Sequence, residues 1–325
     1  MAMINHDILS PSLFHKDTGC NVKTTVDPTV FSFPRFLKEV EKLCQILNAP
    51  FSTSTTEAVL RAYSTHFNNA PVGWRVTSKD SALNYRFFQG RSTDTVTIAI
   101  QAGFIKPSPI TDLVQSWTTL FNDEIQHWCD FDTSKGLVKS WLFLGRTRQM
   151  EEVLDVEFVP ESIRQHMQKF KEHELNRVRT VAVDWHSKTV NLYWRVPGPL
   201  SKTQADNLLG LAGCQPLEEA EVVEIGRFSS AKDGSFAFAV TISLESGEIG
   251  RAAFYATKLL RGNLPAISER LETFLEHAPD YDPEEWITIG WGFIKGGGKY
   301  MKAEKSYCGK FMEKVKNMMI QDPNI

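Results

Sequence analysis

The segment GGGKYMKAEKSY, residues 296–307, joins a glycine-rich turn to a strand of alternating character. Alternation with a period of two puts one set of side chains on a shared face: Tyr300, Lys302, Glu304 and Ser306. The opposite face then carries Met301, Ala303, Lys305 and Tyr307. A strand with a lysine and a glutamate side by side is either a solvent-exposed edge strand or part of the wall of a polar interior. The other strands of the chain distinguish these two interpretations.

Composition places the chain among globular proteins with a sizeable core. It has 325 residues, of which 42% are hydrophobic and 11% aromatic, and its net charge is -3. A net charge this close to zero argues against general affinity for nucleic acid. Any site for an anion must therefore come from local placement of cations, and small molecules are the expected partners.

Cysteine usage and hydropathy both indicate an intracellular protein. The five cysteines are scattered, odd in number and never in a CxxC pair: Cys20, Cys44, Cys129, Cys214 and Cys308. This pattern favours reduced thiols over disulfides or a zinc ribbon. The N-terminus lacks the basic and apolar regions of a secretory signal, and there is no apolar run of membrane-spanning length. We expect a cytoplasmic protein with no membrane association.

Strand pairs recur along the chain at a nearly constant interval. First strands are expected near residues 73, 126, 179, 235 and 287, a repeat of roughly 52 to 56 residues, and helical segments precede most of the pairs. Ten strands in an open sheet would leave two exposed edges, which closure into a barrel removes. We therefore predict an α/β barrel of the α+β kind, a ten-stranded antiparallel β-barrel surrounded by helices and built from five ααββ repeats. Residues 33–325 form this single domain, and residues 1–32 form an N-terminal arm.

The second strand of each pair has one apolar face and one face with a cation or hydroxyl group. If helices cover the outside, the polar faces line the lumen: Asn84 and Arg86, Lys139, Asn191 with Tyr193 and Arg195, Arg251 with Tyr255, and Lys302 with Glu304. First strands add two cations, Arg75 and Arg179. We expect their aromatic companions to line the lumen as well: Trp74, Phe236, Phe238, Trp291 and Phe293.

Several cations that share one interior require an anion, because an isolated buried charge is strongly unfavourable. A small, multiply charged anion such as a diphosphate is a natural occupant. The alternative is that these lysines and arginines pair with carboxylates of the barrel. The second strands supply few acidic residues besides Glu304, which favours the anion site.

Several segments together resemble a known enzyme family. They are LNYRFF (83–88), VAVDW (181–185), VNLYW (190–194), SGEIGRAAFYATK (246–258), IGWGF (289–293) and KYMKAEKSY (299–307). In this order they are similar to the aromatic prenyltransferases of aminocoumarin biosynthesis, the ABBA or PT-barrel group with its bacterial and fungal relatives. The resemblance extends from about residue 36 to residue 310.

The resemblance implies an enzyme that moves a dimethylallyl group from its diphosphate to an electron-rich aromatic ring. It places the diphosphate on six cations, Arg75, Arg86, Lys139, Arg179, Arg251 and Lys302. Asn191, Tyr193 and Tyr255 are implied as hydrogen-bond donors. Glu304 matches the glutamate proposed to act as base in the aminocoumarin branch. For the acceptor and the shielding of the allylic cation we expect Phe236, Phe238, Trp291, Tyr193 and Tyr255.

Magnesium-dependent members of the family have an aspartate where this chain has Asn84. With Arg86 two residues further on, the resemblance implies catalysis without a metal ion and without another cofactor. The expected protein is a monomer acting on dimethylallyl diphosphate and a phenolic, dihydroxynaphthalene, hydroxyphenylpyruvate or phenazine-like acceptor. Two alternatives stay open: a geranyl diphosphate donor, and a non-catalytic barrel that binds a diphosphate or an aromatic ligand.

Overall fold

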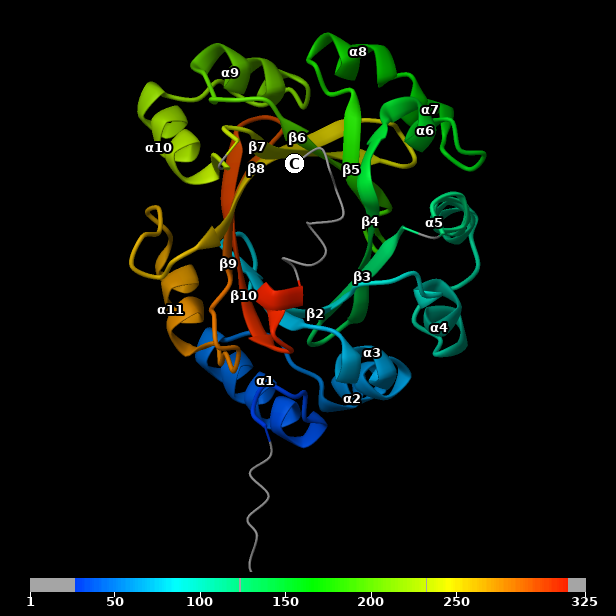
Figure 1. Cartoon of the computed structure of the whole chain (residues 1–325), viewed down its shortest axis with the longest axis vertical. Coiled ribbons are helices and arrows are strands. Elements are labelled where there is room, and N and C mark those ends of the chain that lie inside the picture. The colour runs from blue at the N-terminus through cyan, green and yellow to red at the C-terminus, as the bar shows by residue number, and fades with distance from the viewer. Residues whose placement is uncertain (1–26, 123, 232, 315–325) are drawn as a thin grey trace, which may run out of the picture.

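A computed structural model describes residues 27–122, 124–231 and 233–314 as a closed β-barrel within a layer of helices (Figure 1). The ten strands are β1 Val72–Thr77, β2 Leu83–Gln89, β3 Gln126–Asp132, β4 Gly136–Gln149, β5 Arg177–Asp184, β6 Thr189–Val196, β7 Phe236–Ser243, β8 Ile249–Leu259, β9 Ile287–Ile294 and β10 Gly298–Cys308. Each strand pairs antiparallel with its neighbours in the chain, and β1 pairs with β10 to close the barrel. The predicted fold class is confirmed.

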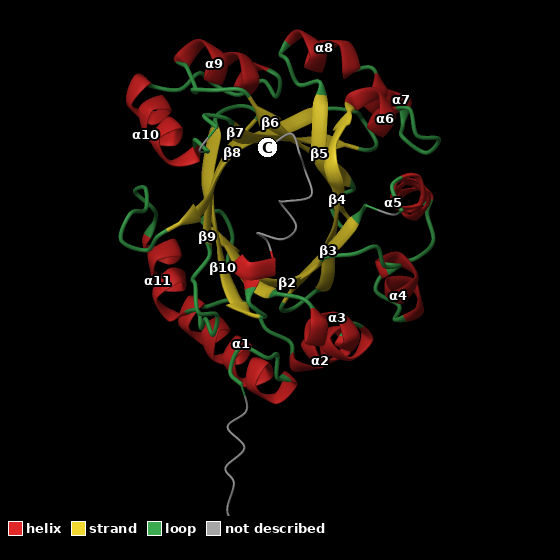
Figure 2. Cartoon of the chain, in the orientation of Figure 1, coloured by secondary structure: helices red, strands yellow, loops and turns green. Residues whose placement is uncertain are grey.

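Helices surround the barrel on all sides (Figure 2). They are α1 Phe33–Leu47, α2 Thr53–Ala62, α3 Ser64–Asn69, α4 Thr95–Gln101, α5 Pro109–Leu120, α6 Met150–Leu154, α7 Glu161–Arg164, α8 Met167–Glu172, α9 Lys202–Gly210, α10 Glu219–Ser229 and α11 Glu269–His277. Within the described ranges, none of them is long and apolar enough to cross a membrane. Of the predicted N-terminal arm, residues 1–32, residues 1–26 lie outside the part of the chain that the structure describes. After β10, residues 311–314, the last that the structure describes, are helical.

Helix α1 shows how sequence periodicity attaches a helix to the barrel. It begins with Pro34 in its first turn, where the missing N–H is not needed. Phe36, Val40 and Leu43 recur at helical spacing and are buried. Phe36 stacks on Trp74 of β1 with ring centroids 4.9 Å apart, and burial of such a side chain contributes about 1.5–3 kcal/mol. Trp74 therefore lies on the outer face of the barrel, not in the lumen as predicted.

The strand register decides which face of each strand points inward, because directly opposed residues share a face. Tyr255 of β8 lies opposite Gly290 of β9, which lies opposite Lys302 of β10. The alternate row joins Phe254, Trp291 and Met301. Phe254 is fully buried among aromatic rings of the hydrophobic core between the sheet and the helices. The row with Tyr255 and Lys302 consequently faces the lumen, as predicted for both residues.

Tertiary contacts and capping residues set where individual helices begin and end. The segment 160–175 forms two short helices, α7 and α8, and His166 lies between them with its Nε2 2.6 Å from the carbonyl oxygen of Gly247. This contact with the β7–β8 turn coincides with the break. Helix α2 begins after its N-cap Ser52, which accepts a hydrogen bond from the Thr55 N–H.

A small aromatic cluster lies where β10 ends. It consists of Phe88, Trp286, Phe311 and Met312, with Trp128 packed against it. The Phe311 ring is 4.5 Å from Phe88 and 4.4 Å from Trp286, centroid to centroid. Phe88 and Trp128 belong to the lumen faces of β2 and β3, since they lie opposite each other in the row that also contains Trp141. The residues after β10 thus add apolar packing at this end of the lumen.

Candidate active site

Two arginines and two carboxylates form a buried quartet in the lumen. Arg75 Nη1 lies 2.8 Å from Asp130 Oδ2, and Arg86 Nε lies 2.7 Å from Asp130 Oδ1. On the other side, Arg86 Nη1 lies 3.0 Å from Glu304 Oε2, and Arg75 Nε lies 3.7 Å from Glu304 Oε1. Burial acts to lower the pKa of Arg75, but Asp130 and Glu304 outweigh it and raise that pKa. The Arg75 guanidinium is therefore charged, and the two carboxylates hold both guanidinium groups in place.

Asp130 is a site residue that the sequence reasoning missed. It is fully buried and pairs with both arginines. Alternation along QHWCDFD, residues 126–132, could have found it, because Asp130 shares a face with Gln126 and Trp128. The alternative that lumen cations pair with carboxylates thus holds for Arg75 and Arg86, with Asp130 and Glu304 as the partners.

Two lysines contribute ammonium groups to the same lumen. Lys139 and Lys302 are 9% and 8% exposed. Lys139 Nζ donates to Asn191 Oδ1 at 3.3 Å, and Lys302 Nζ donates to the hydroxyl of Tyr255 at 2.9 Å. Burial lowers the pKa of Lys139 to about 7, while Asp184 on the neighbouring strand acts in the opposite direction. Burial also lowers the pKa of Lys302.

Aromatic rings and hydroxyl groups lie beside these cations. The rings of Trp141 and Tyr193 are 5.1 Å apart, and those of Tyr193 and Tyr255 are 5.8 Å apart. Arg86 Cζ lies 5.0 Å and Lys139 Nζ 5.4 Å from the centre of the Trp141 ring. Burial and the neighbouring Tyr255 raise the pKa of Tyr193, so its hydroxyl keeps its proton. The lumen therefore places cations, hydrogen-bond donors and π faces side by side.

The remaining predicted polar residues also face inward, in different surroundings. Asn191 donates through Nδ2 to Thr241 Oγ1 at 2.8 Å, so it orients Lys139 as well as lining the wall. Arg251 lies opposite Thr241 on β7 and Ile294 on β9, and it is partly exposed. Arg179 occupies the irregular point of β5 between Val178 and Thr180, with Cζ 5.0 Å from the Phe143 ring.

Three aromatic residues predicted to meet the acceptor are on the outside of the barrel. Phe236 and Phe238 are fully buried against Phe254, at 5.9 and 5.3 Å, and Trp291 lies opposite Phe254 in the sheet. Phe293, expected beside them, packs on Phe254 at 6.1 Å in the same outer layer. The prediction was wrong because alternation shows only which residues share a face. The aromatic residues on the lumen face are instead Phe88, Trp128, Trp141, Phe143 and Tyr300, together with Tyr193 and Tyr255.

Asn84 lies between Arg75 on β1 and Asp132 on β3. Asp132 uses Oδ1 to accept hydrogen bonds from the backbone N–H groups of Ser134 and Lys135, at 2.8 and 3.0 Å. Across the parts of the chain that the structure describes, no three His, Cys, Asp or Glu side chains come together in a way that could hold a metal ion.

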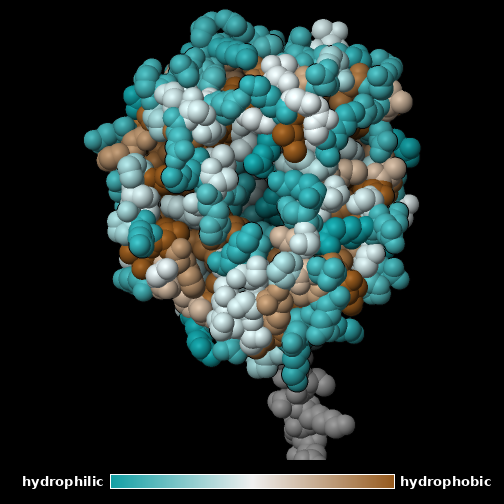
Figure 3. Space-filling model, turned by 180° about the vertical axis from the view of Figure 1, so that it is seen from behind, coloured by the Kyte–Doolittle hydropathy of each residue, from teal (hydrophilic) through white to brown (hydrophobic). Residues whose placement is uncertain are grey.

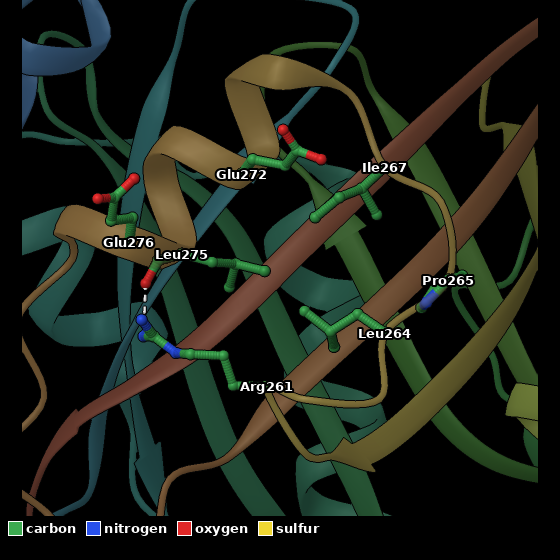
Figure 4. A pocket seen from close by; sticks show the side chains of 7 residues that line it. All are labelled: Arg261, Leu264, Pro265, Ile267, Glu272, Leu275 and Glu276. Atoms are coloured by element: carbon green, nitrogen blue, oxygen red, sulfur yellow. Dashed lines mark hydrogen bonds between the residues drawn. The ribbon is translucent and has the colours of Figure 1, made fainter.

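Two small concavities border helices α10 and α11. One, of about 240 Å³, is formed by the loop before α11 and by α11 itself; Leu264, Ile267 and Leu275 point toward one another there (Figure 4). The other, of about 320 Å³, lies between α10 and strands β9 and β10, with Trp291, Tyr300 and Met301 in its lining. Neither contains the cations described above. Seen from behind, the molecule is hollowed near its centre, where hydrophilic residues gather (Figure 3).

Comparison with known proteins agrees with this geometry. The family model "Aromatic prenyltransferase Orf2" matches residues 31–319. An aromatic prenyltransferase of Sclerotinia sclerotiorum is 43% identical over 297 residues, which are 89% of this chain and 95% of the relative. One of Botryotinia fuckeliana is 42% identical over 303 residues, 91% of this chain and 97% of the relative. The 4-hydroxyphenylpyruvate 3-dimethylallyltransferase of Streptomyces niveus is 33% identical over 285 residues, 87% of each protein.

Solved structures share the fold at low sequence identity. The apo form of prenyltransferase PriB has a TM-score of 0.56 and 13% identity, and the match covers 84% of this chain and 95% of PriB. The 5-dimethylallyltryptophan synthase of Streptomyces coelicolor has a TM-score of 0.55 and 14% identity, with 85% and 97% covered. At this identity the likeness concerns the barrel architecture.

Proposed function

Because the chain belongs to the Orf2 family of aromatic prenyltransferases, we propose that it transfers a dimethylallyl group from dimethylallyl diphosphate to a carbon atom of an electron-rich aromatic acceptor, without a metal ion. The buried pair of ammonium groups, Lys139 and Lys302, is the observation that carries this proposal. Each lysine is hydrogen-bonded to a neutral partner, and neither forms an ion pair with a carboxylate among the described residues. A diphosphate supplies the negative charge that these two groups require.

Ionisation of the donor is the step that the cations promote. The bond between C1 of the dimethylallyl group and the diphosphate oxygen breaks, and its electron pair stays on the diphosphate. The ammonium groups of Lys139 and Lys302 stabilise this negative charge. The fixed guanidinium groups of Arg75 and Arg86 in the quartet add positive potential. Charges held in advance in a water-poor interior stabilise such a leaving group without reorganisation. Tyr193 and Tyr255 supply hydroxyl donors beside them.

The allylic cation requires shielding from water and contact with π faces. Trp141, Tyr193 and Tyr255 form a continuous aromatic surface in the lumen. A cation over such a ring is stabilised by about 0.5–2 kcal/mol per contact. Tyr193 and Tyr255 were expected in this role from the sequence, and Trp141 takes the place expected of Phe236, Phe238 and Trp291.

The acceptor attacks the cation through a ring carbon and forms the new C–C bond. The arenium intermediate, or the acceptor hydroxyl before attack, then gives up a proton, for which we propose Glu304 as base. Oε2 of Glu304 accepts from Arg86 at 3.0 Å, whereas Oε1 is 3.7 Å from the nearest Arg75 nitrogen. A carboxylate has about four lone-pair positions, so one oxygen can accept the proton while the other stays paired.

The test is an assay with purified protein, dimethylallyl diphosphate and aromatic acceptors, with EDTA present throughout. Hydroxyphenylpyruvate, dihydroxynaphthalenes and dihydrophenazines are the acceptors, and mass spectrometry detects the product. We expect a singly prenylated product in EDTA. Product that appears only after magnesium is added contradicts metal independence. If no donor and acceptor pair gives a product, the proposed transferase activity is contradicted. Geranyl diphosphate in parallel reactions decides the donor length.

A matched variant separates substrate binding from folding. Arg251→Ala removes a partly exposed lumen cation whose neighbours in the sheet, Thr241 and Ile294, are uncharged. We expect a folded protein with strongly reduced turnover. A fully active Arg251→Ala protein removes Arg251 from the diphosphate site.

A further inference from the structure

Strand β9 carries two glycines at inward-facing positions in its centre. In ITIGWGFI, residues 287–294, Gly290 and Gly292 alternate with outward-facing Ile289, Trp291 and Phe293. Glycine weakens the interior of a strand and marks a place where something approaches closely. Neither glycine has a positive φ angle, so the backbone itself would accept alanine. The reason for glycine must lie in the space above each Cα.

Tyrosine rings occupy that space. A Cβ atom on Gly290 would lie 2.9 Å from Cε1 and 3.0 Å from Cδ1 of Tyr255, which is opposite it on β8. A Cβ atom on Gly292 would lie 2.3 Å from Cζ of Tyr300, which is opposite it on β10. Such approaches are too close for carbon atoms in contact. Both rings therefore lie across β9, against the wall, in room that only glycine leaves.

Lys302 lies between these two rings. It is opposite Gly290 on β10, and its Nζ atom is 5.1 Å from the centre of the Tyr255 ring and 5.4 Å from that of Tyr300. The ammonium group donates to the Tyr255 hydroxyl at 2.9 Å. The position of Lys302 thus depends on where the Tyr255 ring lies, and that ring depends on Gly290.

We propose that Gly290 and Gly292 are positioning residues, which let Tyr255 and Tyr300 lie against the barrel wall and so place the Lys302 ammonium for the diphosphate. The inference rests on the proposed diphosphate site. An added methyl group at position 290 displaces the Tyr255 ring toward the lumen axis. The hydrogen bond to Lys302 is then lost, and the ammonium moves away from the phosphate oxygens.

Binding of inorganic diphosphate, measured by calorimetry, tests the proposal without the acceptor or turnover. We expect Gly290→Ala to weaken binding by about tenfold, as befits a lost hydrogen bond to a charged group. Tyr255→Phe keeps the ring but removes the hydroxyl, and we expect a similar loss. The control is Gly250→Ala, at the irregular point of β8 beside Arg251, where nothing lies within 4 Å of the added Cβ; this variant should bind like the wild type.

A double-mutant cycle distinguishes positioning from a general effect on the barrel. In a Tyr255→Ala background the ring is absent, so Gly290→Ala should then change the affinity less than twofold. Equal losses in both backgrounds overturn the proposal, as does a Gly290→Ala protein with wild-type affinity. If Gly290→Ala alone does not fold, the double variant should fold, and its failure to do so also overturns the proposal. Absence of diphosphate binding in the wild type contradicts the proposed function instead.

Discussion

The charge of Lys139 depends on pH near neutrality. Burial lowers its pKa to about 7 in the free protein, and a bound diphosphate raises that pKa by placing negative charge beside it. By linkage, donor affinity is greatest below pH 7, falls as the pH rises through 7 and levels off above the pKa of the complex. Each unit by which the two pKa values differ corresponds to about a tenfold loss of affinity across this window.

Calorimetric titrations with inorganic diphosphate between about pH 6 and 9 check this dependence, with Lys139→Arg as the matched control. The arginine stays charged over the whole range, so its profile shows the ionisation of diphosphate and of the other groups at the site, including Lys302, without that of Lys139. Superimposable profiles for the two proteins would contradict the role of Lys139.

Asp130 holds two cations at once, and its loss should destabilise the fold. Asp130→Asn removes the charge that Arg75 and Arg86 share and leaves Glu304 as their single partner in the quartet. Breaking a buried pair in this way costs about 3–5 kcal/mol, measured as the change in unfolding free energy in urea. Glu57→Gln, which breaks an exposed pair with Arg61 on α2, should change stability by less than about 1 kcal/mol. Equal stabilities for the two variants would count against the quartet.

Glu304 has two proposed roles, which one substitution separates. As the base, its replacement in Glu304→Gln should lower kcat by about 10²–10⁴-fold. As a partner of Arg75 and Arg86, its replacement leaves more positive potential in the lumen, so affinity for inorganic diphosphate should not fall. Unchanged kcat with dimethylallyl diphosphate and a productive acceptor would exclude the role as base.

At the scale of elements, α11 fastens the start of the barrel to the helical layer through Arg270. Its guanidinium donates to four carbonyl oxygens: those of Leu47 at 2.6 Å, Ser81 at 2.7 Å, Thr77 at 3.2 Å and Ala82 at 3.3 Å. These belong to the C-terminus of α1, the end of β1 and the β1–β2 turn. One side chain therefore joins three segments that are distant from α11 in sequence.

Replacing this arginine should weaken the attachment of α11. Arg270→Met keeps much of the apolar side chain but leaves the four carbonyl groups without their donor, and we expect a loss of about 2–3 kcal/mol in urea unfolding. Arg227→Met, on the exposed face of α10, is the control and should stay close to the wild type. A similar small change in both variants would show that the contacts of Arg270 contribute little.

Closure of the sheet has a consequence for the whole molecule. Each of the ten strands pairs with two neighbours, and β1 with β10 leaves no open edge in the described barrel. Open edges are the usual place where sheets of two chains join. We expect a monomer of 36.8 kDa, measured by light scattering after size exclusion over a range of protein concentrations. A mass near twice that value at every concentration would contradict this expectation.

Much of the architecture followed from local pattern. The repeat of paired strands predicted ten strands and closure, and alternation along β2, β4, β6, β8 and β10 identified the residues that face the lumen. Lys139, Tyr255 and Lys302 are where that reasoning put them. Alternation works for these strands because one face is polar and the other apolar, so the sequence shows which face points into the lumen.

The same pattern could not decide the inward side of β7 and β9. In β9, glycines alternate with Trp291 and Phe293, and both faces are buried, one by the helices and one within the barrel. Amino-acid composition distinguishes a polar face of a strand from an apolar one. It does not show which of two apolar faces points inward. Only the register with Tyr255 and Lys302 showed that the glycines point inward.

The sequence by itself thus determined a closed barrel of ten strands, its helical surroundings and a lumen that carries cations, because periodicity and repeat length are properties of neighbouring residues. Tertiary structure decided which charges meet. Asp130 of β3, Arg75 and Arg86 of the first hairpin and Glu304 of β10 come together although they are spread from residue 75 to residue 304, because β1 closes against β10. In GGGKYMKAEKSY, alternation put Lys302 and Glu304 on one face. The closed barrel gave Glu304 two arginine partners and placed Lys302 between two tyrosine rings.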